Sequence, residues 1–98
     1  MKLIISPRAL SQLTELVTWW RANRTAAAGH LEDEFERVAH LVTEQPRLGR
    51  RYRQDLAVRV HPLRKTPYSV FYEVHEVAQE VRVVAVWSTM RQEPPPDL

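Results

Sequence analysis

Seven basic side chains lie close together in the middle of this 98-residue chain. Between positions 47 and 65 the only acid is Asp55, so the segment carries a net charge of +6 and the remainder carries −4. A cationic cluster on an otherwise acidic chain suits a polyanionic partner, either a nucleic acid or an acidic segment of another protein. A solvated basic loop that aids solubility is the alternative. The basic residues are Arg47, Arg50, Arg51, Arg53, Arg59, Arg64 and Lys65.

The other ionisable residues form no recognisable catalytic or metal-binding pattern. His30 and His40 are ten residues apart on one predicted helix, so they do not make the i, i+4 pair of a helical metal site. The acidic residues at 32–36 fall off the apolar stripe of that helix, and we expect them to be solvated. Without cysteine the chain can form no disulfide, thiol nucleophile or cysteine-ligated zinc site. We therefore expect no metal and no cofactor.

Two strands joined by a loop, over residues 56–74, position the centre of the basic cluster. In the first strand apolar residues alternate with Arg59 and His61, so one face is apolar and the other presents a cation and an imidazole. Two prolines bracket the connection, and proline cannot donate to a sheet ladder, so Arg64 and Lys65 are expected in an exposed turn. Alternation resumes over residues 68–74, which predicts the second strand.

Two amphipathic helices are predicted before this hairpin. The first begins at a Ser-Pro pair and keeps apolar residues three or four apart to about residue 21. The second has the same spacing over residues 28–42 and ends before Pro46. Because the connection is short, the helices should pack antiparallel. Trp19 lies off the first stripe and is either a docking anchor for a partner or folded against a neighbouring element.

Further strands are predicted near both ends of the chain. Residues 2–5 form a short apolar strand, and residues 81–87 are apolar on both sides, which indicates an interior strand. Strict alternation in the latter would place four side chains on one face: Val81, Val83, Ala85 and Trp87. Residues 93–98 contain three consecutive prolines and predict a polyproline-type tail with no partner in the chain. We expect one domain over residues 1–92 followed by this tail.

The order of these elements predicts an α+β fold, β-α-α-β-β-β, in which an antiparallel helical hairpin packs on a small antiparallel sheet. The other face of the sheet should be open and should include Arg59 and His61. RNA-binding proteins interleave aromatic with basic residues, and on this face we expect only Phe71. No apolar run approaches the roughly 20 residues of a membrane span, and the N-terminal apolar stretch is too short for a signal peptide. A cytoplasmic protein without a membrane partner is therefore expected.

Three sequence patterns accompany this order: PRLGR after the second helix, RV.PL.KTPYSVFYEV over the hairpin, and V.VVAVW.T.R near the C-terminus. Together they resemble the RelE/ParE superfamily of bacterial toxins from type II toxin-antitoxin systems, over nearly the whole chain and with closer likeness to the ParE-like branch. The resemblance implies the RelE/ParE-like fold and a plasmid-stabilising toxin. It also implies neutralisation by a small ParD- or RelB-like antitoxin in a hetero-oligomer.

The resemblance leaves the cellular target open, because RelE-like members cut messenger RNA in the ribosome and ParE-like members act on DNA gyrase. Cutting RNA needs a base, cations that stabilise the phosphate, and an acid for the leaving oxygen. RelE-like nucleases carry basic residues at the positions of Arg59 and His61, which are catalytic candidates only if this chain is an endoribonuclease. Many also carry an arginine where this chain has Ser69, and a histidine or tyrosine near the C-terminus, where residues 88–91 offer neither.

The resemblance therefore favours a non-enzymatic toxin that acts on DNA gyrase. A ribosome-dependent messenger RNA endoribonuclease and a non-toxic interaction module with the same fold are the alternatives. In each of these three cases the cations and the exposed tryptophan are the residues expected to bind the target or the antitoxin. They are Trp19, Arg50, Arg51, Arg53, Arg59, Arg64, Lys65, Arg82 and Arg91.

Overall fold

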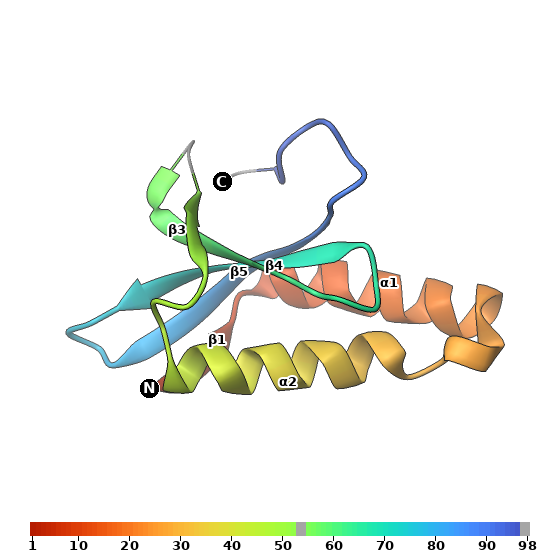
Figure 1. Cartoon of the computed structure of the whole chain (residues 1–98), viewed down its shortest axis with the longest axis horizontal. Coiled ribbons are helices and arrows are strands. Elements are labelled where there is room, and N and C mark those ends of the chain that lie inside the picture. The colour runs from red at the N-terminus through yellow and green to blue at the C-terminus, as the bar shows by residue number, and fades with distance from the viewer. Residues whose placement is uncertain (53–54, 97–98) are drawn as a thin grey trace.

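Two helices cover one face of a five-stranded mixed sheet in the computed structural model, which describes residues 1–52 and 55–96 (Figure 1). The strand order is β1-β5-β4-β3-β2; β1 runs parallel to β5, and the other neighbours are antiparallel. The elements are β1 Lys2–Ile5, α1 Pro7–Asn23, a 3₁₀ turn at Thr25–Ala27, α2 His30–Glu44, β2 Arg50–Tyr52, β3 Asp55–Pro62, β4 Tyr68–His75 and β5 Glu80–Ser88. The predicted α+β order is confirmed, and β2 is an additional strand where a turn was expected. The prediction of a wholly antiparallel sheet was wrong, because the N-terminal strand β1 pairs parallel to β5.

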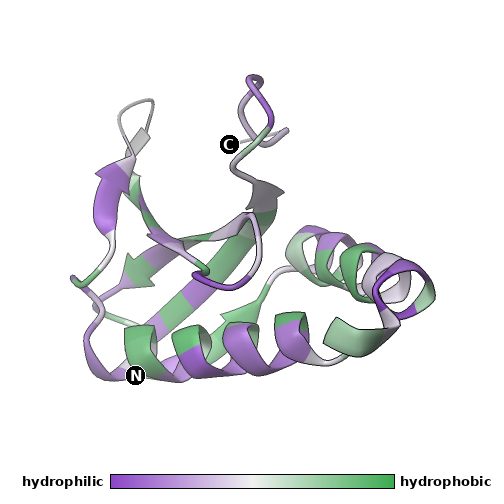
Figure 2. Cartoon of the chain, turned by 45° about the vertical axis from the view of Figure 1, so that its right-hand side comes forward, coloured by the Kyte–Doolittle hydropathy of each residue, from purple (hydrophilic) through white to green (hydrophobic). Residues whose placement is uncertain are grey.

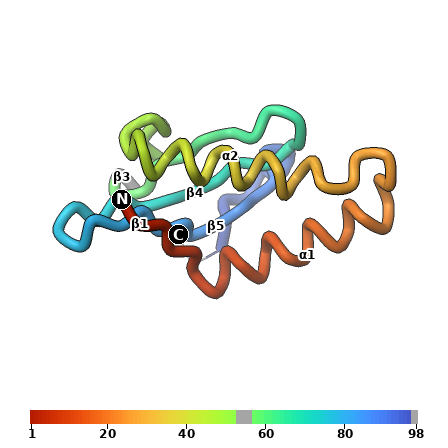
Figure 3. The backbone as a smooth tube through the Cα atoms, turned by 90° about the horizontal axis from the view of Figure 1, so that it is seen from below, coloured from red at the N-terminus to blue at the C-terminus, as the bar shows by residue number. Residues whose placement is uncertain are grey.

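The helices begin and end largely where local chemistry predicts. Ser6 caps α1 by accepting a hydrogen bond from the backbone of Ala9 at 3.1 Å, and Pro7 occupies the first helical position. Before α2, Gly29 has a φ of 91°, a left-handed conformation that glycine adopts without steric cost. The two helices run antiparallel and are joined at one end of the molecule (Figure 3). No helix in the described part of the chain is long and apolar enough to cross a membrane.

The main core lies between the helices and the central strands. Along α2, green, apolar residues face the sheet, whereas purple residues face outward (Figure 2). The first helix contributes fewer deeply buried residues than its sequence suggests: Ala9 is fully buried, but Leu10 is 52% exposed. Fully or almost fully buried side chains in this core include Leu31, Val38, Val42, Val70, Tyr72, Val81, Val83 and Val86.

The interior strand β5 changes, halfway along its length, which face of the sheet its alternate side chains point to. The register with β4 shifts between Phe71 and Tyr72, so Phe71 lies opposite Ala85 while Tyr72 lies opposite Val83. A bulge of this kind inserts one residue and reverses the alternation beyond it. Val86 therefore joins Val81 and Val83 in the core beneath the helices, whereas Ala85 packs on the other face. The predicted interior position of this strand is confirmed, but its predicted strict alternation is wrong.

Candidate functional site

A pocket of about 390 Å³ opens on the sheet face that the helices leave uncovered. In Figure 2 the β2–β3 region and the C-terminal segment rise as two walls from this face of the sheet. Its described lining comes from β2, from β3, from β4, and from β5 with the segment that follows it, so four separated parts of the chain build it. The residues are Arg50, Tyr52, Val60, Ser69, Phe71, Trp87, Ser88, Thr89, Arg91, Gln92, Glu93, Pro94 and Pro95.

The floor of the pocket is a second apolar cluster, separate from the main core. Val58, Val60, Phe71 and Ala85 are buried in it, and partly exposed aromatic rings border it. Tyr52 packs edge-on against Phe71, with ring centroids 5.3 Å apart. Together with Trp87, these rings give the open face three aromatic side chains. The expectation that Phe71 would be the only one was wrong, because β2 was not recognised as a strand and the bulge turns Trp87 toward this face.

Two arginines stand at the edges of the pocket. Arg50 lies opposite Val60 in the β2–β3 register, which places both on the open face. Arg91 lies 4.6 Å from the centroid of the Trp87 ring, a cation–π geometry, and 3.8 Å from the Glu93 carboxylate. An apolar aromatic floor with arginines at its rim is the composition of binding hot spots. The described lining contains no imidazole.

The C-terminal segment forms one wall of the pocket and does not project freely. The indole nitrogen of Trp87 donates a 3.1 Å hydrogen bond to the carbonyl of Glu93, and the Arg8 side chain donates to the carbonyl of Pro96 at 3.3 Å. Pro95 is buried. The prediction that the proline-rich tail lacks a partner in the chain was therefore wrong.

Arg59 and His61 lie on the opposite face from this pocket. In the β3–β4 register, Arg59 is opposite Tyr72 and His61 is opposite Val70, and both partners belong to the core beneath the helices. Side chains directly opposite on neighbouring strands share a face, so Arg59 and His61 lie on the helix side of the sheet. The prediction that they lie on the open face was wrong because the apolar side of β3 packs in the second cluster.

The exposed loop between β3 and β4 is held from below by a buried carboxylate. Glu34 on α2 accepts hydrogen bonds from the backbone nitrogens of Arg64 and Lys65, at 2.8 and 2.7 Å. It also accepts one from the Thr66 hydroxyl at 3.0 Å. The expected exposure of Arg64 and Lys65 is confirmed, but the expectation that Glu34 is solvated was wrong, since it is only 4% exposed.

These hydrogen bonds determine the charge state of Glu34. Burial alone would raise its pKa, but the three hydrogen bonds and the nearby charge of Arg37 outweigh burial, so the pKa of Glu34 is lowered. Glu34 is therefore a carboxylate that orders the basic loop.

The remaining predicted site residues are dispersed. Arg51 is opposite Arg59 on the helix side of the sheet. Arg82 is opposite Glu73 and pairs with Glu80 at 2.8 Å. Arg53 lies outside the described residues.

Trp19, 47% exposed, borders a separate pocket of about 310 Å³ between α1 and the ends of β4 and β5. The structure thus brings only Arg50 and Arg91 of the predicted set together in the larger pocket. Tyr52 and Trp87 were missed as site residues. For Tyr52 the sequence did hold a signal, because it lies two positions after Arg50, the spacing that places two residues on the same face of a strand.

Comparisons with known proteins agree with this architecture. A family model described as "ParE toxin of type II toxin-antitoxin system, parDE" matches residues 3–93. No curated protein matches the sequence.

Two solved structures share the fold at low sequence identity. The first, from the chromosomal ParDE TA system of P. aeruginosa, has a TM-score of 0.73 and 19% identity, covering 90% of this chain and 95% of that one. The second, the isolated E. coli RelE toxin, has a TM-score of 0.70 and 21% identity, covering 94% and 87%.

Proposed function

Because this chain belongs to the ParE toxin family of type II toxin-antitoxin systems, we propose that it acts in the cytoplasm on DNA gyrase and does not cut RNA. The observation that carries this proposal is the separation of Arg59 and His61 from the open-face pocket. The two residues that match the nuclease positions lie on the other side of the sheet. The pocket itself combines aromatic rings with arginines, which suits docking on a protein.

The gyrase proposal is tested with purified components. We expect the chain to inhibit DNA supercoiling by gyrase, and the double variant Arg50→Ala, Arg91→Ala to inhibit at least several-fold less. Arg64→Ala is the matched control, because Arg64 is exposed in the β3–β4 loop and outside the pocket. If gyrase remains fully active at all concentrations of the folded chain, the proposal is wrong.

A ribosome-dependent endoribonuclease is the second candidate, and one observation favours it. Tyr52, Phe71 and Trp87 lie on the face that also carries Arg50 and Arg91, an interleaving typical of platforms on which nucleic-acid bases stack. Cleavage of messenger RNA in purified translating ribosomes, lost in Tyr52→Phe, would support this candidate over gyrase inhibition. Tyr52→Phe retains the ring and removes the one phenol among the described lining residues, so it tests acid–base chemistry separately from stacking.

We further propose that an antitoxin encoded beside this gene neutralises the chain in a hetero-oligomer. Family membership supports this partner. Induction of the chain alone should arrest growth, and co-expression of the neighbouring reading frame should restore it and co-purify with the chain. Pulse labelling during arrest separates the targets, since thymidine incorporation should stop first for gyrase and methionine incorporation first for the ribosome. Normal growth on induction would favour a non-toxic interaction module.

A further inference from the structure

A second polar depression lies on the helix side of the sheet, away from the open-face pocket. It measures about 220 Å³ and is lined by Arg47, Arg51, Ala57, Arg59, Val74 and Glu76. The described residues of this lining therefore include three guanidinium groups and one carboxylate. Arg51 and Arg59 come from opposed positions on β2 and β3, while Arg47 comes from the turn after α2.

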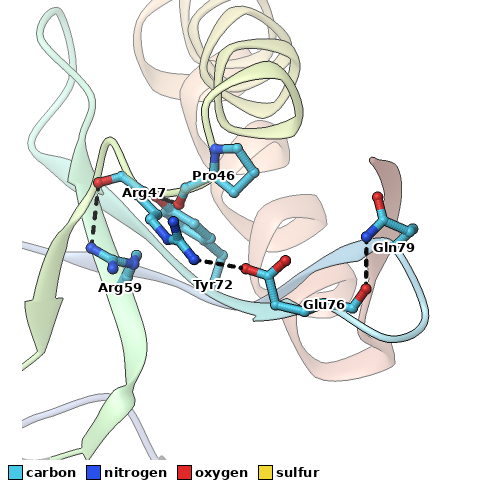
Figure 4. Close-up of polar contacts among 6 residues, drawn as sticks. All are labelled: Pro46, Arg47, Arg59, Tyr72, Glu76 and Gln79. Carbon is cyan, nitrogen blue, oxygen red and sulfur yellow. Dashed lines mark hydrogen bonds and ion pairs between the residues drawn. The ribbon is translucent and has the colours of Figure 1, made fainter.

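The position of Arg59 is fixed by the turn beside it. Its Nη1 donates to the carbonyl of Gly49 at 2.8 Å and to that of Arg47 at 3.3 Å (Figure 4 shows the second contact). These bonds use one nitrogen of a planar group with five N–H donors, so they orient the guanidinium while it retains the capacity to bind an anion. Such preorganisation reduces the entropy lost on binding.

Tyr72 holds the turn at Pro46 to Gly49 in place. Its hydroxyl donates to the carbonyl of Pro46 and accepts from the amide of Gly49, both at 2.8 Å. Burial raises the pKa of this hydroxyl, despite the hydrogen bond from Gly49 and the charge of Arg59, so it stays protonated and keeps donating at neutral pH. The backbone carbonyls that orient Arg59 are therefore tied to the core.

The carboxylate of the depression can be displaced by a ligand. Glu76 accepts from Arg47 at 3.3 Å (Figure 4), and both side chains are more than half exposed. Exposed ion pairs of this kind contribute little stability, so exchanging one carboxylate for another costs little. Among the described residues that line the depression, three are arginines and one is a glutamate, a composition that attracts an anionic group.

The residues around the depression favour a protein over a nucleic acid as the molecule that supplies the anionic group. No aromatic ring is among the described residues that line the depression, so bases would have no stacking platform. A neighbouring concavity of about 470 Å³ shares Arg47 and Glu76 and adds Met1, Pro46 and the 45% exposed Leu48. A cationic surface thus continues directly into an apolar one.

We propose that Arg47, Arg51 and Arg59 form a binding site for an acidic segment of a protein partner, whose adjacent apolar side chain packs against Leu48. The carboxylates pair with guanidinium groups, which present bidentate donors in matching geometry. In naming a partner the inference rests on the proposed antitoxin, but the site is defined by this chain's own residues. Its test requires neither toxicity nor gyrase.

The test is a titration of the isotope-labelled full chain with a synthetic peptide of alternating glutamate and leucine, followed by NMR. We expect shifts at the Gly49 amide and the Arg59 side chain. The double variant Arg47→Glu, Arg51→Glu should bind the peptide about tenfold or more weakly. Neither side chain makes the hydrogen bonds that hold the Gly49 turn through Tyr72, and a thermal melt verifies that the variant is folded. The matched control is Arg64→Glu, Lys65→Glu, with the same charge change in the β3–β4 loop.

Three results would overturn the site. Equal weakening in the control would show a non-specific charge effect, and tighter binding of a thymidine oligonucleotide at the same arginines would make the ligand a nucleic acid. If a leucine-free polyglutamate peptide bound as tightly as the alternating glutamate and leucine peptide, the proposed packing of an apolar side chain against Leu48 would be wrong. Because gyrase inhibition by the same variants is measured separately, failure of this site and failure of the proposed function give different results.

Discussion

The Glu34 carboxylate on α2 lies 3.0 Å from the hydroxyl of Thr66 in the loop between β3 and β4, and both side chains are buried. Glu34→Gln should lower the free energy of unfolding by about 1–3 kcal/mol, because an amide replaces one acceptor oxygen with a donor that faces other donors. Urea denaturation measures the loss. Glu36→Gln, an exposed position on the same helix, should change stability by less than about 0.5 kcal/mol. Equal effects of the two substitutions would contradict this account of the loop.

The same carboxylate should make stability depend on acid pH. In the unfolded chain Glu34 titrates near its ordinary pKa of 4.5, and in the folded chain its pKa is lower, since hydrogen bonds outweigh the opposing effect of burial. A depressed folded pKa stabilises the protein fully above pH 4.5, and that stabilisation is lost as the pH falls toward and through the folded value. Denaturation curves across this range should show a smaller acid-induced loss for Glu34→Gln than for the wild type. Identical pH profiles would rule out Glu34 as a contributor.

Gly49 is required because Tyr72 leaves no room for a side chain. A Cβ at this position would lie 2.6 Å from the Tyr72 hydroxyl oxygen, 2.9 Å from its Cε1 and 3.0 Å from the Val60 carbonyl oxygen. Gly49→Ala should therefore destabilise the fold by about 1–3 kcal/mol. Combining it with Tyr72→Phe should cost less than the sum of the two single substitutions, since the hydroxyl clash is gone. Strict additivity in thermal or chemical denaturation would refute the contact.

Two leucines on different helices provide a matched test of the core. Leu31 is fully buried, whereas Leu10 is 52% exposed although it belongs to the predicted apolar stripe of α1. Leu31→Ala should cost about 2–5 kcal/mol through lost burial and the cavity left behind. Leu10→Ala should cost well under half as much, as judged by the denaturation midpoint. A reversed ranking would mean that α1 is rotated relative to the sheet.

Trp87 should control how firmly the C-terminal segment covers the open-face pocket. Trp87→Phe keeps an aromatic ring but removes the indole N–H that donates to the Glu93 carbonyl. We expect faster amide hydrogen exchange at Arg91, Gln92 and Glu93, measured by mass spectrometry, because a weakly anchored segment opens more often; the three prolines that follow carry no amide hydrogen. Trp19→Phe, on the exposed side of α1, is the control and should leave this segment unchanged. Unaltered exchange in both variants would show that the indole does not anchor the wall.

The sequence predicted the order of the elements better than the faces of the strands. Alternation correctly separated Val60 from Arg59 in β3, but a period of two cannot say which side the helices will cover. The pairing of Arg59 with Tyr72 decides this, and it depends on a register set across two strands. The bulge opposite Phe71 and Tyr72 also reverses which face the later side chains of β5 point to, and no local pattern in the sequence of β5 predicts it.

The candidate site was predictable only in part for the same reason. The cluster of cations was visible in the sequence, yet the sheet divides it between two faces. Arg50 lines the open-face pocket. Arg51, the next residue in the sequence, lines the depression on the other side of the sheet. The burial of Glu34 was hidden because its partners are loop backbone groups more than 29 residues away. Such long-range partners leave no periodic signal.

The pairing of β1 with β5 ties the completion of the sheet to the synthesis of β5. The parallel partners of residues 2–5 are residues 80–83, so the sheet cannot close until the ribosome has translated at least about 75 further residues beyond β1. Contacts this distant in sequence form late and slowly. A chain interrupted before β5 would leave the helices without an interior strand that contributes Val81, Val83 and Val86 to the core beneath them. Prematurely terminated products should therefore be unstructured and harmless to the cell that makes them, whichever target the complete chain attacks.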